Sequence, residues 1–323
     1  AGSHRRRREA EGLCGETLSD DPGVAVLERF GLTDRDMIAL TGESTVYVLD
    51  DERVLRLRHA ERRTRGDDPH GFVDYQLRRA ALCNELPPLS FQVPRLLDHG
   101  EVAGEPYTVE ARIPGQSLDL VLRKLSGERR VKALVAYADA AREIASIEMD
   151  RKWYGELMLA DEMRFKKWRD YLLARTESQV LRARPRLVAD GIPIEDIVED
   201  FGKRTKAIAH VKHGLVHGDF FPGNVLVSKD LRVTGVIDFG FSTLVGDPRM
   251  DMVGASCFLE VSREFSTPQD AHVVRSYLRA KAGIKDDIYA LYRTYYALYF
   301  AFTHEFGLKL YDWCLETLRE QRP

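Results

Sequence analysis

A short segment of the chain, His217 to Val227, carries side chains that could act on a phosphate group. It offers a carboxylate at Asp219 and an amide at Asn224, in a loop that glycine and proline hold out of a helix. A further carboxylate, Asp238, follows shortly afterwards. Such oxygen-bearing side chains suit Mg²⁺, which keeps several waters and completes its coordination shell with phosphate oxygens. The segment therefore predicts metal-assisted chemistry on a phosphate.

Two strands must position these side chains. Residues 225–227 and 233–237 are rich in valine and isoleucine, which predicts two short strands. If the strands pair as a hairpin, Asn224 and Asp238 lie at the same end of it, next to the loop that carries Asp219. We therefore expect the three side chains to converge on one point.

The spacing of these residues resembles the catalytic apparatus of kinases, in which His-x-Asp and a following Asn precede Asp-Phe-Gly. His-Gly-Asp at 217–219 is similar to the motif of the aminoglycoside phosphotransferase family, whose relatives include macrolide, choline and homoserine kinases. The specific part of the resemblance covers residues 215–251. It implies an α+β, bilobal protein-kinase-like fold, with a small β-rich N-terminal lobe and a large, mainly helical C-terminal lobe.

The resemblance also implies roles for single residues. Asp219 would accept the proton of the acceptor hydroxyl, while Asn224 and Asp238 would complete the catalytic set by holding one or two Mg²⁺. The phosphate donor would be ATP or GTP. His217 and Asp251 are expected to support the loop structurally rather than to react, since Asp219 already supplies the base.

The first third of the chain predicts a nucleotide-binding lobe. Residues 45–49 and 53–57 are strand-like runs separated by a polar turn, which predicts a hairpin. Period-two alternation places Val54 and Arg56 on one face. The segments 41–47 and 110–115 resemble the nucleotide loop and the hinge of the family. The resemblance thus implies these nucleotide-binding residues: Gly42, Ser44, Val46, Val54, Arg56, Glu110, Ala111 and Arg112.

The sequence departs from the family pattern at two places. Arg56 stands where a lysine is usual in protein kinases, and the two cations bind phosphate differently because arginine presents a planar fork. The family also has an acidic partner for this cation on the following helix, which we predict over about 72–86. The nearest acids, Asp74 and Glu85, do not fall at that position. The partner of Arg56 is therefore not assigned from the sequence.

The chain as a whole predicts three segments. Residues 1–24 read as the remnant of a tag followed by a flexible tail, residues 25–113 as the nucleotide-binding lobe, and residues 114–323 as the helical lobe with the catalytic loop and the acceptor site. Further strands are predicted near 95–99 and 106–112. Helical spacing of apolar residues predicts helices around 131–145 and 194–208, and again from about 268.

Composition excludes several other classes of protein. The chain has 323 residues, 44% of them hydrophobic, which is enough for a buried core, and its net charge of −3 disfavours nucleic-acid binding. No apolar run could span a bilayer, and the N-terminus lacks the apolar core of a signal peptide. The four cysteines fit free thiols in a reducing compartment. We expect a cytoplasmic protein without a membrane or nucleic-acid partner; the sequence predicts no oligomeric state.

The acceptor is predicted to be a small molecule with a hydroxyl group. The helical regions show no acidic excess, which favours a neutral or weakly charged antibiotic, such as a macrolide, over a polycationic aminoglycoside. A metabolic kinase for choline, homoserine or a sugar is the alternative, and a non-catalytic nucleotide-binding module is a third hypothesis. The tyrosines and phenylalanines of 289–302 are expected to pack in the core, or else to line the acceptor pocket.

Overall fold

The computed structural model describes residues 21–40, 44–59, 69–158, 163–306 and 309–321. The chain divides into two compact units. The first comprises Ala1–Asn84 with Arg95–Arg112, and the second comprises Glu85–Pro94 with Ile113–Pro323. The first unit is rich in strands and the second in helices, which confirms the predicted α+β class.

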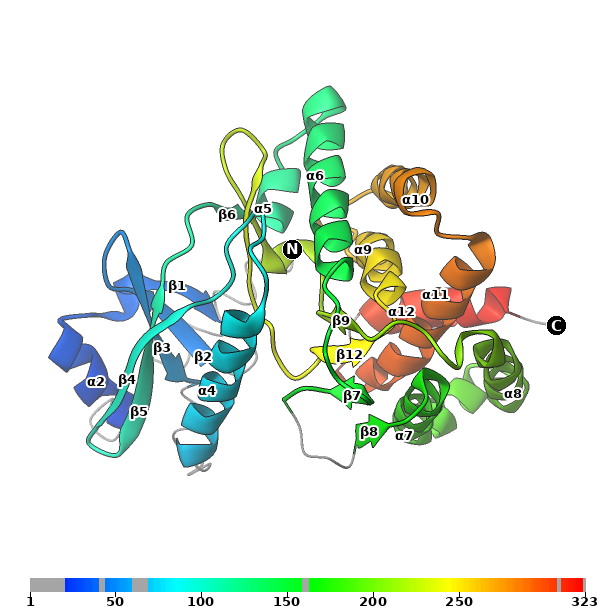
Figure 1. Ribbon diagram of the computed structural model, residues 1–323, viewed down its shortest axis with the longest axis horizontal. Helices are drawn as coiled ribbons and strands as arrows, with labels where there is room; N and C mark the ends of the chain where they lie inside the picture. Colours follow the sequence, from blue (N-terminus) through cyan, green and yellow to red (C-terminus); the bar gives the residue numbers. More distant parts are fainter. Residues whose placement is uncertain (1–20, 41–43, 60–68, 159–162, 307–308, 322–323) are drawn as a thin grey trace. The chain divides into compact units, whose positions relative to one another are not determined.

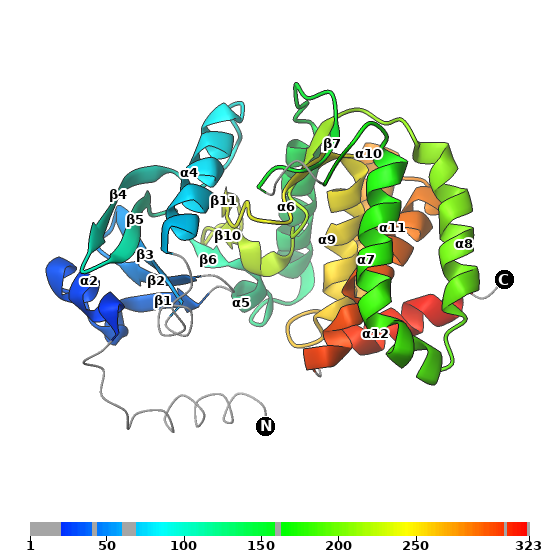
Figure 2. The same cartoon turned by 90° about the horizontal axis from the view of Figure 1, so that it is seen from below.

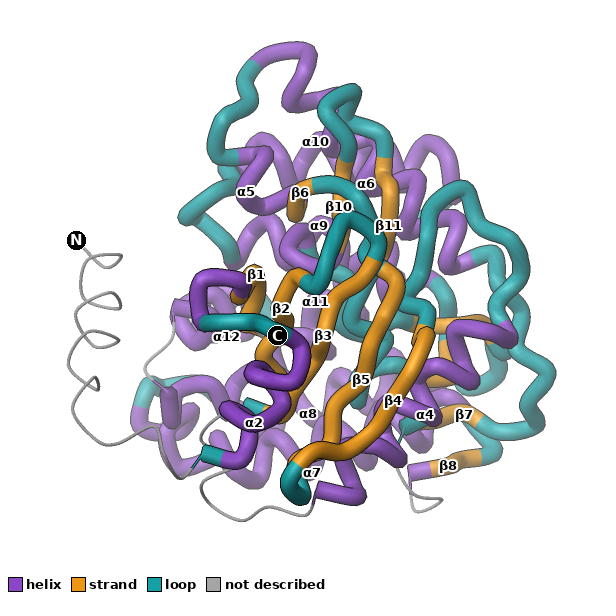
Figure 3. The backbone as a smooth tube through the Cα atoms, turned by 90° about the vertical axis from the view of Figure 1, so that its left-hand side faces the viewer, coloured by secondary structure: helices purple, strands orange, loops and turns teal. Residues whose placement is uncertain are grey.

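A five-stranded antiparallel sheet forms the centre of the first unit. Its strands lie in the order β1-β2-β3-β5-β4, and Figure 3 shows them side by side. The predicted hairpin is confirmed as β2 paired with β3. The elements of this unit that Figure 1 labels are α2 (Pro22–Phe30), β1 (Met37–Leu40), β2 (Ser44–Val48), β3 (Arg53–Arg58), α4 (Pro69–Glu85), β4 (Leu96–Val102) and β5 (Glu105–Ala111). A 3₁₀ turn (Asp34–Asp36) precedes β1.

The two faces of this sheet differ in chemistry. Residues directly opposite each other on paired strands share a face. In the register, Arg56 lies opposite Val46 on β2 and Thr108 on β5, and Val54 lies opposite Glu110, so these side chains share one face. The other face is apolar and packs with Val26 and Leu27 of α2; its residues are Tyr47, Leu55, Leu57, Tyr107 and Val109.

The second unit is mainly helical. Its helices are α5 (Leu118–Leu122), α6 (Gly127–Ala145), α7 (Trp168–Ala189), α8 (Ile194–Arg204), α9 (Arg249–Val261), α10 (Pro268–Ala282), α11 (Asp286–Phe300) and α12 (Lys309–Glu320). Short 3₁₀ turns cover Thr205–Ile208, Pro222–Asn224 and Ala301–Phe306. No helix in the described ranges is long and apolar enough to cross a membrane.

Local sequence explains where these helices begin and end. Thr267 and Asp270 form a capping box at the start of α10, Pro268 occupies its first turn, and Gly283 ends it at a φ of 66°. This is the arrangement expected for a helix that starts at Thr-Pro-x-Asp and stops at a glycine. The same Asp270 also binds Arg130, at 2.6 Å, which ties α10 to α6.

The aromatic helix predicted over 289–302 is α11, which packs against α7, α9 and α12 (Figure 2). Tyr289, Tyr292, Tyr295 and Tyr296 are all buried, whereas Tyr299 and Phe300 are half-buried. These buried tyrosines point to several sides of α11, because neighbouring helices cover more than one of its faces. The first four tyrosines therefore belong to the core.

Two small sheets complete the second unit. One has the order β11-β10-β6 and contains the predicted hairpin of β10 (Val225–Val227) and β11 (Val233–Val236), with β6 (Gln116–Ser117) at its edge. The other has the order β8-β7-β12-β9 and was not predicted. Its strands are β7 (Tyr154–Glu156), β8 (Arg164–Phe165), β9 (Gly214–Val216) and β12 (Leu244–Gly246).

Candidate active site

The loop between β9 and β10 brings Asp219 and Asn224 into direct contact. The side-chain nitrogen Nδ2 of Asn224 donates to the backbone carbonyl of Asp219 at 2.9 Å and to its Oδ2 at 3.1 Å. Asn224 is 7% exposed and ends the 3₁₀ turn that leads into β10. Because Nδ2 is used in this way, the amide oxygen is the atom of Asn224 that a cation could bind.

The hairpin places Asp238 beside this pair. Val225 and Val236 are register partners, and the amide of Ile237 donates to the carbonyl of Asn224 at 2.9 Å. Asp238 follows directly, with a left-handed φ of 65°. Few residues other than glycine adopt this conformation, and in folded proteins it is concentrated at turns and functional sites. The structure therefore brings Asp219, Asn224 and Asp238 together, as the hairpin argument expects.

The electrostatics of Asp219 agree with this proximity. The pKa of Asp219 is raised to about 6, because burial and the negative charge of Asp238 raise it and outweigh the hydrogen bond from Asn224, which lowers it. A carboxylate held in this way is a better proton acceptor than an exposed aspartate, because its conjugate acid is weaker.

His217 joins the loop to the start of the Asp-Phe-Gly segment. Its Nε2 lies 2.9 Å from the carbonyl of Ile237, and its Nδ1 accepts from the amide of Asp219 at 3.3 Å. A carbonyl can only accept, so Nε2 carries the proton and the ring is neutral. Burial lowers the pKa of His217, which also favours the neutral ring. These contacts fit the structural role that we predict for this residue.

Asp251, in the first turn of α9, holds the loop from the other side. Its carboxylate accepts from the amide of His217 at 2.5 Å and from the amide of Gly218 at 2.9 Å. Burial raises the pKa of Asp251 to about 7, although both amide hydrogen bonds lower it. Asp251 thus satisfies two buried backbone donors that would otherwise lack a partner.

Gly218 is a site residue whose role the sequence argument missed. Its φ is 78°, and a Cβ atom at this position would lie 2.0 Å from the carbonyl oxygen of Ser242. Only glycine fits a left-handed backbone in such close contact. The available signal was the residue type itself, since the loop reads His-Gly-Asp where kinases usually have His-Arg-Asp.

Tyr137 of α6 was also missed. Its hydroxyl donates to the carbonyl of Phe220 at 2.7 Å, and its ring stacks on the ring of Phe220 with a centroid separation of 5.0 Å. No sequence signal links the two residues, because they lie far apart along the chain.

The donor set at this point fits Mg²⁺. Asn224 and Asp238 offer one amide and one carboxylate group, both oxygen donors, which suits an ion that takes its other ligands from water and phosphate. In the described part of the chain, no group of three or more His, Cys, Asp or Glu side chains could hold a metal ion. The site therefore does not resemble an all-protein cage of the kind that binds zinc or calcium.

The predicted nucleotide-binding side chains of the first unit share the polar face of its sheet. Arg56 donates from Nη1 to Ser44 Oγ at 2.6 Å and from Nε to Glu110 Oε1 at 2.9 Å. Val46 and Val54 lie on the same face and are buried. Gly42 lies outside the described residues. Glu110, which we placed in the predicted hinge, is thus the acidic partner of Arg56 that the sequence left unassigned.

The backbone of the predicted hinge is partly engaged within the first unit. The amide of Ala111 donates to the carbonyl of Arg95 at 2.8 Å, and the amide of Arg112 donates to the carbonyl of Glu52 at 2.7 Å. Neither amide is available to a nucleotide base in this conformation. Recognition of a base edge by these residues would have to use a carbonyl, such as that of Ala111.

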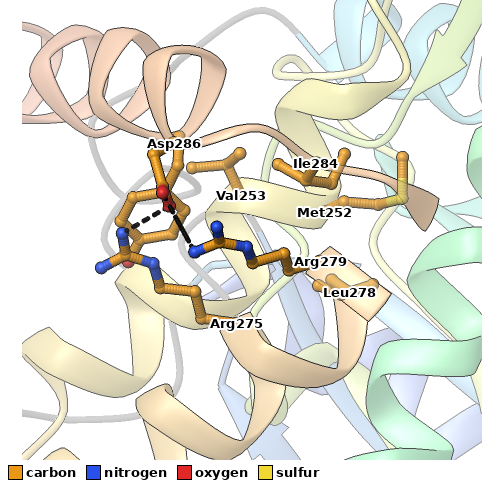
Figure 4. A pocket seen from close by; sticks show the side chains of 8 residues that line it. Met252, Val253, Arg275, Leu278, Arg279, Ile284 and Asp286 are labelled. Carbon is orange, nitrogen blue, oxygen red and sulfur yellow. Dashed lines mark hydrogen bonds and ion pairs between the residues drawn. The ribbon is translucent and has the colours of Figure 1, made fainter. Parts of the chain in front are cut away.

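A small pocket in the second unit lies among α9, α10 and α11 (Figure 4). Its lining includes Arg275 and Arg279, which both bind Asp286, at 3.2 Å and 3.0 Å. The space is about 10 Å³, room for roughly one water, and none of the predicted site residues lines it. It is a packing defect between helices rather than a site for a substrate.

Comparison with known proteins gives a family and a fold. Residues 39–295 match the sequence model of the phosphotransferase enzyme family. The chain is similar to APH(2″)-IIa in its ternary complex with streptomycin and ATP, with 18% identity and a TM-score of 0.57 over 95% of this chain and 98% of the other. An aminoglycoside phosphotransferase from Streptomyces rimosus has 17% identity and a TM-score of 0.55, over 94% of this chain and 99% of the other.

The similarity extends to an enzyme for a different acceptor. A type I macrolide 2′-phosphotransferase has 17% identity and a TM-score of 0.53, over 95% of this chain and 98% of the other. A search of curated proteins found no match. At these identities the solved structures show a common kinase-like fold.

Proposed function

The chain belongs to the phosphotransferase enzyme family, and on this basis we propose that it transfers the γ-phosphate of ATP or GTP to a hydroxyl of a small molecule, in particular an antibiotic. The observation that carries the proposal is the contact of Asn224 with Asp219, beside Asp238, at the end of the β10–β11 hairpin. A nucleotide-binding module without catalysis would have no need of a half-buried base in this setting.

Asp219 acts as the base in the proposed reaction. Its carboxylate accepts a hydrogen bond from the acceptor hydroxyl and takes the proton as the new oxygen–phosphorus bond forms. The bond between the γ-phosphorus and the bridging oxygen breaks, and the nucleoside diphosphate leaves with that oxygen and its electron pair. Asn224 orients the carboxylate, since its Nδ2 donates to Oδ2.

Asn224 and Asp238 are the residues that would hold Mg²⁺. When bound, the ion neutralises the charge of the β- and γ-phosphates. His217 connects the loop that contains Asn224 to Ile237, the residue before Asp238, and Asp251 accepts from the amide of His217. These contacts keep the oxygen donors of Asn224 and Asp238 close to each other.

The first unit supplies the nucleotide-binding side chains in this proposal. The guanidinium of Arg56, which is oriented by Ser44 and Glu110, binds the phosphates. Val46 and Val54 provide apolar contact for the base. Gly42, Ala111 and Arg112 remain proposed nucleotide contacts through their backbone, with the restriction on the two hinge amides noted above.

An antibiotic acceptor is supported by the shared fold with aminoglycoside and macrolide phosphotransferases. Within the second unit, three half-buried phenylalanine rings form a row that begins at Phe221, two residues after Asp219. The ring centroids of Phe221 and Phe258 are 6.2 Å apart, and those of Phe258 and Phe300 are 5.9 Å apart. An aromatic surface near the base favours a neutral or weakly charged acceptor over a polycation.

A screen of acceptors tests the proposal. The full chain is incubated with Mg²⁺, with ATP or GTP, and with macrolides, aminoglycosides, nucleoside antibiotics, choline, homoserine and sugars. Mass spectrometry then detects the addition of one phosphate. We expect transfer to an antibiotic and none with Asp219→Asn. Transfer to choline, homoserine or a sugar alone would assign a metabolic kinase, and nucleotide binding without transfer to any compound would contradict the enzyme proposal.

We also propose that the protein works in the cytoplasm, where nucleoside triphosphates are available. Cys83, Cys257 and Cys314 are free and buried, as expected for a protein made in a reducing compartment. Detection of the native protein in a cytoplasmic fraction tests this location.

A further inference from the structure

Three charged side chains of the first unit form what we call the arginine–glutamate cluster: Arg56 on β3, Arg79 on α4 and Glu110 on β5. Arg56 Nε donates to Glu110 Oε1 at 2.9 Å, and Arg79 Nη2 donates to the same oxygen. The three residues are 8%, 3% and 3% exposed. Two guanidiniums from different elements therefore share one buried carboxylate oxygen.

The cluster departs from the family pattern, in which the helix supplies an acid for the cation on the strand. Here α4 supplies a second cation, Arg79, and the acid, Glu110, comes from β5. The acids considered earlier do not serve, because Asp74 is exposed and Glu85 is exposed and binds Arg151. The link from α4 to Arg56 therefore runs through Glu110.

The shared oxygen couples the two arginines. Burial alone would raise the pKa of Glu110, but the charges of Arg56 and Arg79 outweigh it and lower the pKa. Glu110 is thus ionised, and its position is set by both cations. If Arg79 is removed, Glu110 loses one of the two cations that set its position, and it then orients the Arg56 guanidinium less firmly. A planar fork binds phosphate well only in a fixed orientation.

Two more polar groups lie next to the cluster. Gln76, one turn before Arg79 on α4, and Thr108, opposite Arg56 in the sheet, are 2% and 0% exposed. Gln76 Oε1 and Thr108 Oγ1 have no hydrogen-bond partner among the described residues. Buried polar atoms are seldom left without partners. Their presence marks this region as one built for a polar ligand or its waters rather than for packing alone.

We propose that Arg79 is a positioning residue for the phosphate donor: through Glu110 it fixes the guanidinium of Arg56 in the orientation that binds the nucleotide phosphates. The inference rests on the proposed function, because it requires that Arg56 binds phosphate. It adds a residue of α4 to the nucleotide site and makes the orientation of the Arg56 guanidinium depend on that helix.

Binding measurements with a phosphate-dependent readout test this inference. Isothermal titration of the full chain with Mg·ADP and with adenosine, or with Mg·GDP and guanosine, separates phosphate contacts from base contacts. Arg79→Met should weaken binding of the diphosphate by about 10–100-fold, the range for loss of a charged hydrogen bond, and leave the nucleoside unchanged. Arg79→Lys should restore most of the loss, since one charged donor suffices for Oε1.

Two controls make the test specific. Arg78→Met removes an exposed arginine from the same helix and should change neither affinity. In an Arg56→Met background, Arg79→Met should cause no further loss, because the two residues act through one contact. Thermal unfolding shows whether Arg79→Met is folded. If it is not, it is replaced by Arg79→Gln, which keeps the size of the side chain and a hydrogen-bond donor but not the charge.

The outcomes distinguish this inference from the proposed function. Equal losses for diphosphate and nucleoside, additive losses with Arg56→Met, or wild-type affinity in Arg79→Met would overturn the positioning role alone. Failure of the wild-type chain to bind either diphosphate would overturn the proposed function as well. Selective loss of diphosphate affinity with rescue by lysine would support both.

Discussion

The side-chain nitrogen of Asn224 donates to both the carbonyl and the carboxylate of Asp219, at 2.9 Å and 3.1 Å. The residue proposed to bind the metal thus also orients the residue proposed as the base. The amide group of Asn224 is thus proposed both to bind the metal and to orient the base. Removing the side chain of Asp219 or of Asn224 tests these roles.

Asp219→Ala should abolish transfer while nucleotide affinity changes little, because the carboxylate meets the acceptor rather than the donor. Positioned bases contribute about 10²–10⁴-fold to the rate, so turnover should fall by at least about 10²-fold. Steady-state kinetics and titration with nucleotide measure the two quantities. Turnover within about tenfold of wild type would show that Asp219 is not the base.

Asn224→Ala should raise the Mg²⁺ concentration required for half-maximal activity, because one of two protein oxygen donors is lost. We expect a shift of about 10–100-fold, together with a lower maximal rate from the unsupported Asp219. Rates measured over a Mg²⁺ series provide the test, with Asn84→Ala, an exposed asparagine of α4, as the control. An unchanged Mg²⁺ requirement would contradict the ligand role.

Gly218→Ala should destabilise the protein more than the same change at Gly191. Both glycines have a left-handed φ, of 78° and 75°, and alanine there costs about 1–2 kcal/mol. At Gly218 the new Cβ would also lie 2.0 Å from the Ser242 carbonyl oxygen, whereas at Gly191 nothing lies within 4 Å. Urea unfolding of the two variants measures the difference. Equal losses would mean that the loop can move away at no cost.

Asp251 should make stability depend on pH. Folding raises its pKa from 3.8 to about 7, so the folded state favours the protonated carboxyl. The contribution of protonated Asp251 to the free energy of unfolding is fully present below the pKa that this residue has in the unfolded chain. It is lost as the pH rises toward about 7, with a slope of at most about 1.4 kcal/mol per pH unit.

Asp251→Asn should remove this dependence and lower overall stability, since its amide nitrogen cannot accept from the amide of His217 or Gly218. Unfolding free energies of both proteins between pH 4 and pH 8 measure the effect. A wild-type curve parallel to that of the variant would show that Asp251 does not titrate in this range.

The parts of the fold that the sequence predicts are those fixed by local pattern. The hairpins of β2 with β3 and of β10 with β11 follow from short strand-like runs that are separated by short polar segments, and both are confirmed. The family resemblance, which rests on residues 215–251, is also confirmed. The convergence of Asp219, Asn224 and Asp238 was predictable because one hairpin positions all three.

What the sequence did not predict depends on long-range pairing. The partner of Arg56 is Glu110, which lies opposite Val54 only because β3 and β5 are neighbours in the sheet. The sheet of β7, β8, β9 and β12 was missed because its central strand β12 pairs with β7 and β9, which lie far from it along the chain. Such contacts are set by tertiary packing rather than by local preference.

The contacts that hold residues 217–219 have a further consequence for synthesis of the chain. His217 is held by Ile237, by Thr243 and by Asp251, all of which follow it in sequence. The loop therefore emerges from the ribosome before any of these three residues does. The loop can reach its working shape only after α9 has emerged, so a nascent chain stopped short of Asp251 would carry every reactive side chain of the loop and still be inert.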